Sequence, residues 1–343
     1  MLVLAGDVGG TKTALAVAEV GPRSLRFLRV RLYRSLDWPG LDAMVDHFLA
    51  PDSVRPRAAA FGVAGPVRDG VAQITKLPWS VEALSLARRL RPARVALLND
   101  FVAAAHGLPR LSPRRVARIL PGTPEPDGPI GLIGAGTGLG QAVLVRTDGA
   151  TVVLPSEGGH ADFGPRDERE DRLVDFVRSR FGRVSRDRLL SGEGIGLLYD
   201  FLALEWGRPV PPALARALAA GDRAAAITRF GLAGRDPVCR EAVDLFVSIY
   251  GSESANVAMQ YQATGGVYIA GGIAPKILPA MRRRAFRESF RRKPPMEEFL
   301  AGIPVGVVLD PRLPLIGAAT EAYRIAIETT RRRSKTTFRR RSR

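Results

Sequence analysis

The adjacent residues Asn99 and Asp100 are of types that could take part in catalysis. They follow an uncharged apolar run at residues 95–98, typical of a buried strand, and precede Phe101 and a run of alanines, which favour a helix. Ligands bind at the carboxyl ends of strands in open α/β sheets, so a carboxylate here could accept a proton from a bound substrate. The segment alone is equally consistent with a helix cap.

Asp7 is a second candidate, because it ends an apolar strand and stands beside the glycine turn at residues 8–12. A strand, a glycine turn and a strand recur at residues 130–145. Backbone N–H groups in such turns can face an anion, so the two turns could hold a polyphosphate, and Asp7 could bind a hydrated Mg²⁺. Ordinary bends and a turn-forming aspartate are the alternatives. The spacing excludes a Walker loop and a Rossmann turn.

A third group of titratable residues, Glu157, His160 and Asp162, surrounds a double glycine. A carboxylate accepts two hydrogen bonds and a neutral histidine both donates and accepts, so such a group could bind several hydroxyls at once. A lone histidine is usually a satisfied core residue. Because Glu157 stands three positions before His160, the pattern favours a hydroxyl-rich ligand.

The elements that must position these residues are strands alternating with helices in two lobes. With 343 residues and 46% hydrophobic content the chain can form a sizeable core. A Pro- and Gly-rich stretch at residues 120–129 predicts a small α/β lobe over 1–118 and a large α/β lobe over 119–315. We expect the last helix, about 316–330, to return to the small lobe. Residues 331–343 are expected to form a disordered basic tail.

The net charge of +17 is concentrated in two places, the tail and residues 282–293. Spread over one face it would indicate a nucleic-acid partner, whereas a tail of this kind is more often a solvated terminus. The N-terminus has no basic region of a signal peptide, and no stretch approaches a membrane span, so we expect a cytoplasmic protein without a membrane partner. Cys239 is the only cysteine, which excludes an internal disulfide and a cysteine-based zinc site.

The ordered set of motifs resembles the bacterial glucokinase family over about residues 2–320. The motifs are Gly6-Asp7-Val8-Gly9-Gly10-Thr11-Lys12, Leu98-Asn99-Asp100-Phe101, Gly134-Ala135-Gly136-Thr137-Gly138-Leu139-Gly140, Glu157-Gly158-Gly159-His160-Ala161-Asp162-Phe163, Leu190-Ser191-Gly192-Glu193-Gly194 and Ala270-Gly271-Gly272-Ile273-Ala274-Pro275-Lys276.

This resemblance implies a two-lobed actin-like ATPase (ribonuclease H-like) fold with a central cleft, ATP with Mg²⁺, glucose as substrate and a homodimer. It implies that Asp100 is the catalytic base, and that the sugar ligands are Asn99, Asp100, Glu157, His160 and Asp187. The nucleotide would meet residues of the glycine-rich segments. These are Gly6, Asp7, Gly9, Gly10, Thr11, Lys12, Gly136, Thr137, Gly138, Gly271 and Gly272, with Asp7 also reaching the metal through water.

Two positions depart from the family pattern in ways that bear on the sugar fit. Asp187 stands where a glutamate is usual, and Lys76 where an asparagine is common. A kinase for another hexose or an N-acetylhexosamine is therefore the nearest alternative. A nucleic-acid-binding or regulatory protein on an inactive kinase fold is a further alternative, suggested by the arginine-rich tail, although we expect nucleic acid to be no partner of the folded part.

Overall fold

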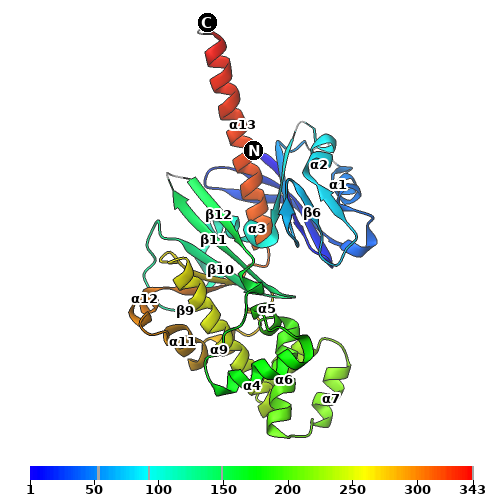
Figure 1. The fold of residues 1–343 in the computed structure, drawn as a ribbon. Coiled ribbons are helices and arrows are strands. Elements are labelled where there is room, and N and C mark those ends of the chain that lie inside the picture. The colour runs from blue at the N-terminus through cyan, green and yellow to red at the C-terminus, as the bar shows by residue number, and fades with distance from the viewer. Residues whose placement is uncertain (52–54, 92, 148–149, 342–343) are drawn as a thin grey trace. The chain divides into compact units, whose positions relative to one another are not determined.

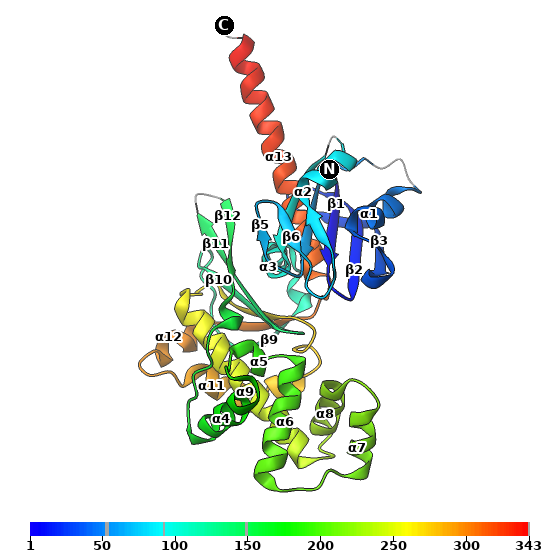
Figure 2. The same ribbon diagram turned by 45° about the vertical axis from the view of Figure 1, so that its right-hand side comes forward.

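The computed structural model describes residues 1–51, 55–91, 93–147 and 150–341 and is drawn in Figures 1 and 2. The chain forms two compact units. Unit 1 comprises Met1–Ser112 with the C-terminal residues from Arg312, and unit 2 comprises Pro113–Pro311. Within the described residues, no helix combines the length and the apolar character needed to cross a membrane.

The predicted lobe boundary after residue 118 is displaced from the observed one. It would cut through β9 (Val116–Leu120), which pairs with β14 (Val305–Val308) inside unit 2. The division therefore falls earlier, between Ser112 and Pro113. A pairing between strands so far apart in the sequence leaves no local sign at residue 116.

Unit 1 is built on a five-stranded sheet with the order β3-β2-β1-β4-β8. Strands β1, β4 and β8 are parallel, and β1-β2 and β2-β3 are antiparallel pairs, which confirms the predicted hairpin at the N-terminus. The register places Asp7 opposite Gly62 and Val63 opposite Asn99, so the parallel strands end at one edge. The strands are β1 (Leu2–Val8), β2 (Lys12–Val20), β3 (Leu25–Arg34), β4 (Ala58–Val63) and β8 (Arg94–Asn99).

Helices cover both faces of this sheet, because alternate side chains of its apolar central strands point to opposite sides. On one face Leu4 and Phe61 pack with residues of α1 (Leu41–Leu49) and α2 (Ala83–Arg89). On the other face Val3 and Ala5 pack with Ala318 of α13 (Leu313–Arg341). A small three-stranded sheet completes the unit. Its strands are β5 (Val67–Arg68), β6 (Val71–Gln73) and β7 (Ser80–Glu82), and α2 follows β7 directly.

Helix α3 (Asp100–Gly107) crosses α13 at very short range. A Cβ atom on Gly317 would lie 1.6 Å from the carbonyl oxygen of Ala103, and one on Gly107 would lie 2.6 Å from that of Leu313. Only glycine fits at these two positions. The C-terminal helix therefore fixes the helix that begins with Asp100.

The backbone of α13 is helical through Arg341, beyond the predicted end near residue 330. We expected a disordered tail from residue 331, whereas residues 331–341 continue the helix. Residues 331–341 contain no proline or glycine and are rich in arginine, which is a good helix former, so nothing in their backbone preference stops the helix. Residues 342–343 lie outside the described part of the chain.

Unit 2 is built on a six-stranded sheet with the order β12-β11-β10-β13-β14-β9, in which β10, β13 and β14 are parallel. The strands not yet given are β10 (Ile130–Ala135), β11 (Leu139–Thr147), β12 (Ala150–Ser156) and β13 (Gly266–Ala270). The helices are α4 (Glu168–Phe181), α5 (Arg186–Leu189), α6 (Gly192–Trp206), α7 (Pro212–Ala219), α8 (Arg223–Leu232), α9 (Pro237–Gln260), α10 (Leu278–Met281), α11 (Arg284–Arg291) and α12 (Glu297–Gly302). The repeated strand, turn and strand device at β10-β11 was predicted and is confirmed.

The long helix α9 runs through the core of unit 2, alongside the sheet in Figure 1. Tyr250, near its middle, is fully buried, and its hydroxyl accepts a hydrogen bond of 2.9 Å from the backbone N–H of Ala135. Ala135 is the last residue of β10. The helix is thereby anchored at the point where the second glycine turn begins.

We predict that His106 makes unit 1 sensitive to acid. Burial lowers the pKa of its imidazole, although Glu321 lies 3.9 Å away on α13 and opposes the shift. The folded state therefore takes up this proton at a lower pH than the unfolded chain, in which a histidine titrates near pH 6.5. Stability is present above that pH and is lost as the pH falls below it. Urea unfolding at pH 8 and pH 5 should show that wild type loses more free energy of unfolding than His106→Asn.

The matched control is His47→Asn, which removes an exposed imidazole of the same unit. Its loss on acidification should follow wild type. Equal acid sensitivity of wild type and His106→Asn would show that His106 does not contribute.

Candidate active site

Asn99 and Asp100 stand at the junction of β8 and α3. The side-chain oxygen of Asn99 accepts hydrogen bonds from the backbone N–H groups of Phe101 at 2.9 Å and Val102 at 3.4 Å, so Asn99 is the N-cap of α3. Its amide nitrogen donates to the carbonyl of Gly65 at 3.4 Å. The capping interpretation is therefore right for Asn99, and it leaves Asp100 as the first residue of the helix.

Asp7 and Asp100 influence each other electrostatically. The pKa of Asp7 is raised to about 7, first by burial and then by the negative charge of Asp100. One oxygen of Asp100 accepts a hydrogen bond of 2.9 Å from the N–H of Phe101. The edge where the parallel strands end thus carries two carboxylates whose mutual repulsion a cation would relieve.

The oxygen atoms of these two carboxylates suit a hard cation such as Mg²⁺. In the described part of the chain, no cluster of three or more His, Cys, Asp or Glu side chains could enclose a metal by itself. Magnesium keeps several waters and is commonly bound by one or two carboxylates together with substrate phosphates. The donors that Asp7 offers fit this mode of binding.

The first glycine turn is held in shape by contacts that the sequence did not predict. The buried hydroxyl of Ser35 donates to the carbonyl of Gly9 at 2.7 Å and lies 3.0 Å from the hydroxyl of Thr13. A Cβ atom on Gly10 would lie 2.6 Å from the carbonyl oxygen of Thr75, so a side chain is excluded there. The exposed residues Thr11 and Lys12 follow.

The second glycine turn lies at the ends of β10 and β13 in unit 2. The N–H of Gly136 donates to the carbonyl of Gly138 at 2.8 Å, and the N–H of Gly192 donates to the carbonyl of Gly136 at 2.9 Å. Gly271 has a φ of +84°, and a Cβ atom there would lie 2.4 Å from the carbonyl oxygen of Ala135. The predicted residues Gly136, Thr137, Gly138, Gly271 and Gly272 therefore belong to neighbouring loops.

The start of α6 joins this second turn and was not among the predicted site residues. Ser191 is its N-cap, accepting a hydrogen bond of 3.1 Å from the N–H of Gly194. A helix N-terminus favours anions because its first N–H groups lack partners within the helix. The signal that could have identified it was a serine, a preferred N-cap residue, directly before the apolar run of α6.

Glu157, His160 and Asp187 lie together in unit 2. Nδ1 of His160 is 3.4 Å from Asp187, and its Nε2 is 3.9 Å from Glu157. The side chain of Asp187 is 23% exposed, whereas those of His160 and Glu157 are 65% and 75% exposed. Asp162 is instead paired with Arg183 at 2.7 Å. A Cβ atom on Gly138 would lie 4.0 Å from an oxygen of Asp187, so this cluster borders the second glycine turn.

The predicted site residues thus form one group in each unit. Unit 1 holds the first glycine turn, with Asp7, and the Asn99-Asp100 pair. Unit 2 holds the second glycine turn and the cluster of Glu157, His160 and Asp187. Two glycine turns, paired carboxylates and a cluster of polar side chains are residue types that an ATP-dependent sugar kinase requires.

Comparison with known proteins identifies the family. The sequence profile of glucokinases matches residues 4–325. A glucokinase from Nostoc sp. is 39% identical over 340 residues, which cover 94% of this chain and 99% of that protein. The chain belongs to the glucokinase family, and its resemblance to that family is confirmed.

Solved structures show the same fold. The crystal structure of a glucokinase from an Antarctic psychrotroph has a TM-score of 0.84 and 28% identity and covers 94% of this chain and 99% of that chain. A ROK family glucokinase from Streptomyces griseus, solved with glucose and AMPPNP, has a TM-score of 0.63 and 23% identity and covers 94% and 100%. The fold is that of the actin-like ATPases, as predicted.

The two glycines of the loop after β13 should respond differently to substitution. Gly271→Ala places a side chain against the carbonyl of Ala135 at a positive φ, whereas a Cβ atom on Gly272 meets nothing within 4 Å. We expect Gly271→Ala to lower the free energy of unfolding by about 1–3 kcal/mol and to weaken ATP binding, because the loop must shift. Gly272→Ala should stay within about 0.5 kcal/mol of wild type. Denaturant unfolding and calorimetric titration with ATP measure both, and equal effects of the two variants would contradict this account of the loop.

Proposed function

We propose that this chain transfers the γ-phosphoryl group of ATP to glucose, giving glucose 6-phosphate, with Asp100 as the general base. The observation that carries the proposal is the position of Asp100 at the start of α3, beside Asp7 at the edge where β1, β4 and β8 end. Membership of the glucokinase family supports the substrates. A homodimer stays a prediction from the family resemblance, and a cytoplasmic location stays a prediction from the sequence.

The reaction needs a base because a sugar hydroxyl is a poor nucleophile. As the hydroxyl oxygen attacks the γ-phosphorus atom, the carboxylate of Asp100 takes its proton. The new oxygen–phosphorus bond forms while the bond from the γ-phosphorus to the bridging oxygen breaks, and ADP leaves. The remaining contribution of the protein is positioning and the neutralisation of charge.

The side chains proposed to hold the sugar are Asn99, Glu157, His160 and Asp187. The cap on α3 fixes the amide of Asn99, which still has a second N–H to donate to a hydroxyl. Asp187 is one methylene shorter than the usual glutamate, yet it contacts His160 and accepts a hydrogen bond from Ser185. These contacts support a sugar site that uses the shorter acid.

The backbone N–H groups of the two glycine turns are proposed to hold the phosphates of ATP. The residues are Gly6, Gly9, Gly10, Thr11 and Lys12 in unit 1 and Gly136, Thr137, Gly138, Gly271 and Gly272 in unit 2. Mg²⁺ bound with the nucleotide would neutralise phosphate charge, and Asp7 would hold it through water. The nearby carboxylate of Asp100 and the raised pKa of Asp7 support a cation at this position.

Replacement of the base should separate catalysis from binding. We expect Asp100→Ala to lower kcat for glucose phosphorylation by about a hundredfold to ten-thousandfold, the range of general-base contributions. Sugar binding, measured by calorimetry, should persist because the other sugar ligands remain. Asp222→Ala, which removes an aspartate that caps α8, is the control and should leave kcat close to wild type.

The same coupled assay tests the substrates, with glucose, mannose or N-acetylglucosamine as acceptor and ATP or polyphosphate as donor. A higher kcat/KM for a sugar other than glucose would overturn the proposed substrate. Near-normal turnover in Asp100→Ala would overturn the proposed base.

The role of Asp7 predicts a change in magnesium dependence. Asp7→Ala should raise the Mg²⁺ concentration that gives half-maximal activity by about 10–100-fold, as loss of a group that orients metal-bound water does elsewhere. The measurement is a magnesium titration of initial rates at saturating glucose and ATP. An unchanged midpoint would exclude Asp7 from the metal site.

A further inference from the structure

A buried carboxylate on α9 lies behind the proposed sugar site. Glu253 is 4% exposed and accepts hydrogen bonds from Gln141 Nε2 at 2.9 Å, from the Arg186 guanidinium at 2.8 Å and from Asn256 Nδ2 at 2.8 Å. Burial raises the pKa of Glu253, while the charge of Arg186 and the two amide hydrogen bonds oppose that shift. Because all three partners donate, they suit the ionised carboxylate.

The first connection from Glu253 runs through Gln141 to the segment that carries Glu157. Gln141 is 2% exposed and pairs with Ser156 across β11 and β12. A Cβ atom on Gly158 would lie only 2.2 Å from the amide oxygen of Gln141, so the loop rests directly on this side chain. That oxygen has no hydrogen-bond partner among the described residues. The bond to Glu253 therefore sets the orientation of the amide.

The second connection runs through Arg186 to Asp187 and His160. The Arg186 side chain, 16% exposed, forms the ion pair with Glu253, and its backbone N–H donates to the carbonyl of Ala161 at 3.0 Å. The next residue, Asp187, lies 3.4 Å from His160. Glu253 thus binds both Gln141, which contacts the segment of Glu157, and Arg186, which precedes Asp187.

We infer that Glu253 is a positioning residue, which holds the segments at residues 156–162 and 185–187 in the arrangement that binds sugar. This inference rests on the proposed function for the identity of the ligand. A buried ion pair is a poor source of stability, because desolvation offsets much of the attraction, whereas it can fix a unique geometry. Through Gln141 and Arg186, Glu253 contacts the two segments whose side chains must converge on the sugar.

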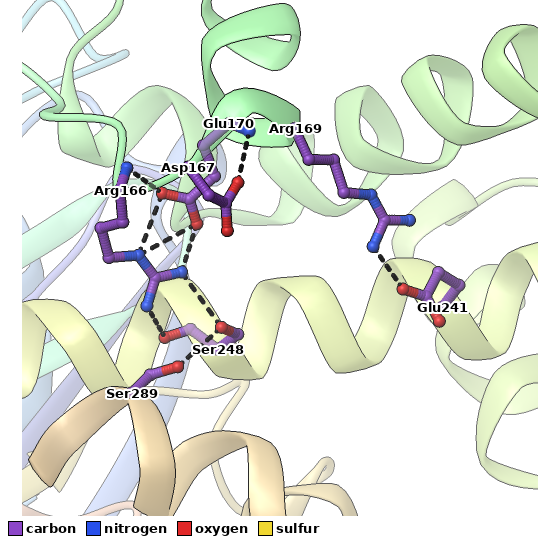
Figure 3. Close-up of polar contacts among 7 residues, drawn as sticks. All are labelled: Arg166, Asp167, Arg169, Glu170, Glu241, Ser248 and Ser289. Atoms are coloured by element: carbon purple, nitrogen blue, oxygen red, sulfur yellow. Dashed lines mark hydrogen bonds and ion pairs between the residues drawn. The ribbon is translucent and has the colours of Figure 1, made fainter. Parts of the chain in front are cut away.

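A second buried glutamate of unit 2 offers a matched control. Glu170 is 1% exposed and accepts hydrogen bonds from the guanidinium of Arg166, which also donates to Ser248 (Figure 3). In the described part of the chain, the hydrogen bonds of the Glu170 carboxylate run to Arg166. Glu170→Gln therefore removes a buried charge of the same kind while leaving the hydrogen bonds of Glu253 to Gln141 and Arg186 in place.

The surroundings of Glu253 make its substitution practicable. It lines a pocket of about 390 Å³ together with Arg166, Asn256 and Lys293. A polar pocket of this size admits water, which can solvate the groups that lose the carboxylate. Glu253→Gln keeps the size of the side chain, so the change is mainly one of charge and of hydrogen-bond donors.

The test compares wild type, Glu253→Gln and Glu170→Gln by amide hydrogen exchange without sugar and by steady-state kinetics. In Glu253→Gln, peptides covering residues 156–162 and 185–189 should exchange about tenfold faster, and KM for glucose should rise about tenfold with kcat and KM for ATP nearly unchanged, since uniform sugar binding is lost. Glu170→Gln should leave exchange in these peptides and KM for glucose at wild-type values.

Two variants test the connections separately and keep the inference testable should Glu253→Gln not fold. Gln141→Met should speed exchange at residues 156–159, and Arg186→Met at residues 160–162 and 185–189. Wild-type exchange at both segments in Glu253→Gln, or in both single-connection variants, would overturn the positioning role. Failure of wild type to phosphorylate glucose would refute the proposed function, while the exchange result would still decide the role of Glu253.

Discussion

The parallel register of β1, β4 and β8 is the constraint on which the catalytic end of unit 1 depends. Because the three strands run in one direction, Asp7 and Asn99 reach the same edge of the sheet. A shift of one residue in either pairing would turn the side chains to the other face. Helix α3 begins at that edge with a cap from Asn99, and the close crossing at Gly107 and Gly317 fixes its direction. The position of Asp100 therefore depends on backbone contacts with the far end of the chain.

Unit 2 also has parallel strands that end at one edge, and a long helix contacts that edge. Strands β10 and β13 are parallel and end in the loops of Gly136 and Gly271. Helix α9 meets this edge through two buried side chains three residues apart, which lie on neighbouring positions of one helix face. The hydroxyl of Tyr250 accepts a hydrogen bond from the N–H of Ala135 at the glycine turn. Glu253 accepts hydrogen bonds from Gln141 and Arg186, which contact the segments proposed to bind sugar. One rigid helix thus orders both the proposed phosphate loop and the proposed sugar loop.

The parts of the fold that could be predicted from the sequence are those that depend on neighbouring residues in the chain. Apolar runs broken by glycine turns predicted both hairpins, and the polar pair after an apolar run predicted the junction of β8 and α3. Ser35 could not be found in this way, since it acts on Gly9 from 26 positions along the chain. Glu253 had a weaker signal that was available, since it is the one charged residue in the stretch of α9 from Leu245 to Gln260. The unit boundary was misplaced because β9 finds its partner almost two hundred residues later.

Glu253 and Asp7 differ in how their negative charge is compensated, and the difference matches what each carboxylate is proposed to do. Glu253 is surrounded by donors, with a guanidinium among them, so the chain itself compensates its charge. Burial and the charge of Asp100 both raise the pKa of Asp7. A cation bound with the nucleotide, as proposed, would oppose both influences and favour the ionised carboxylate of Asp7. A compensated carboxylate keeps a loop in place, whereas one without such compensation can change its partners during a catalytic cycle.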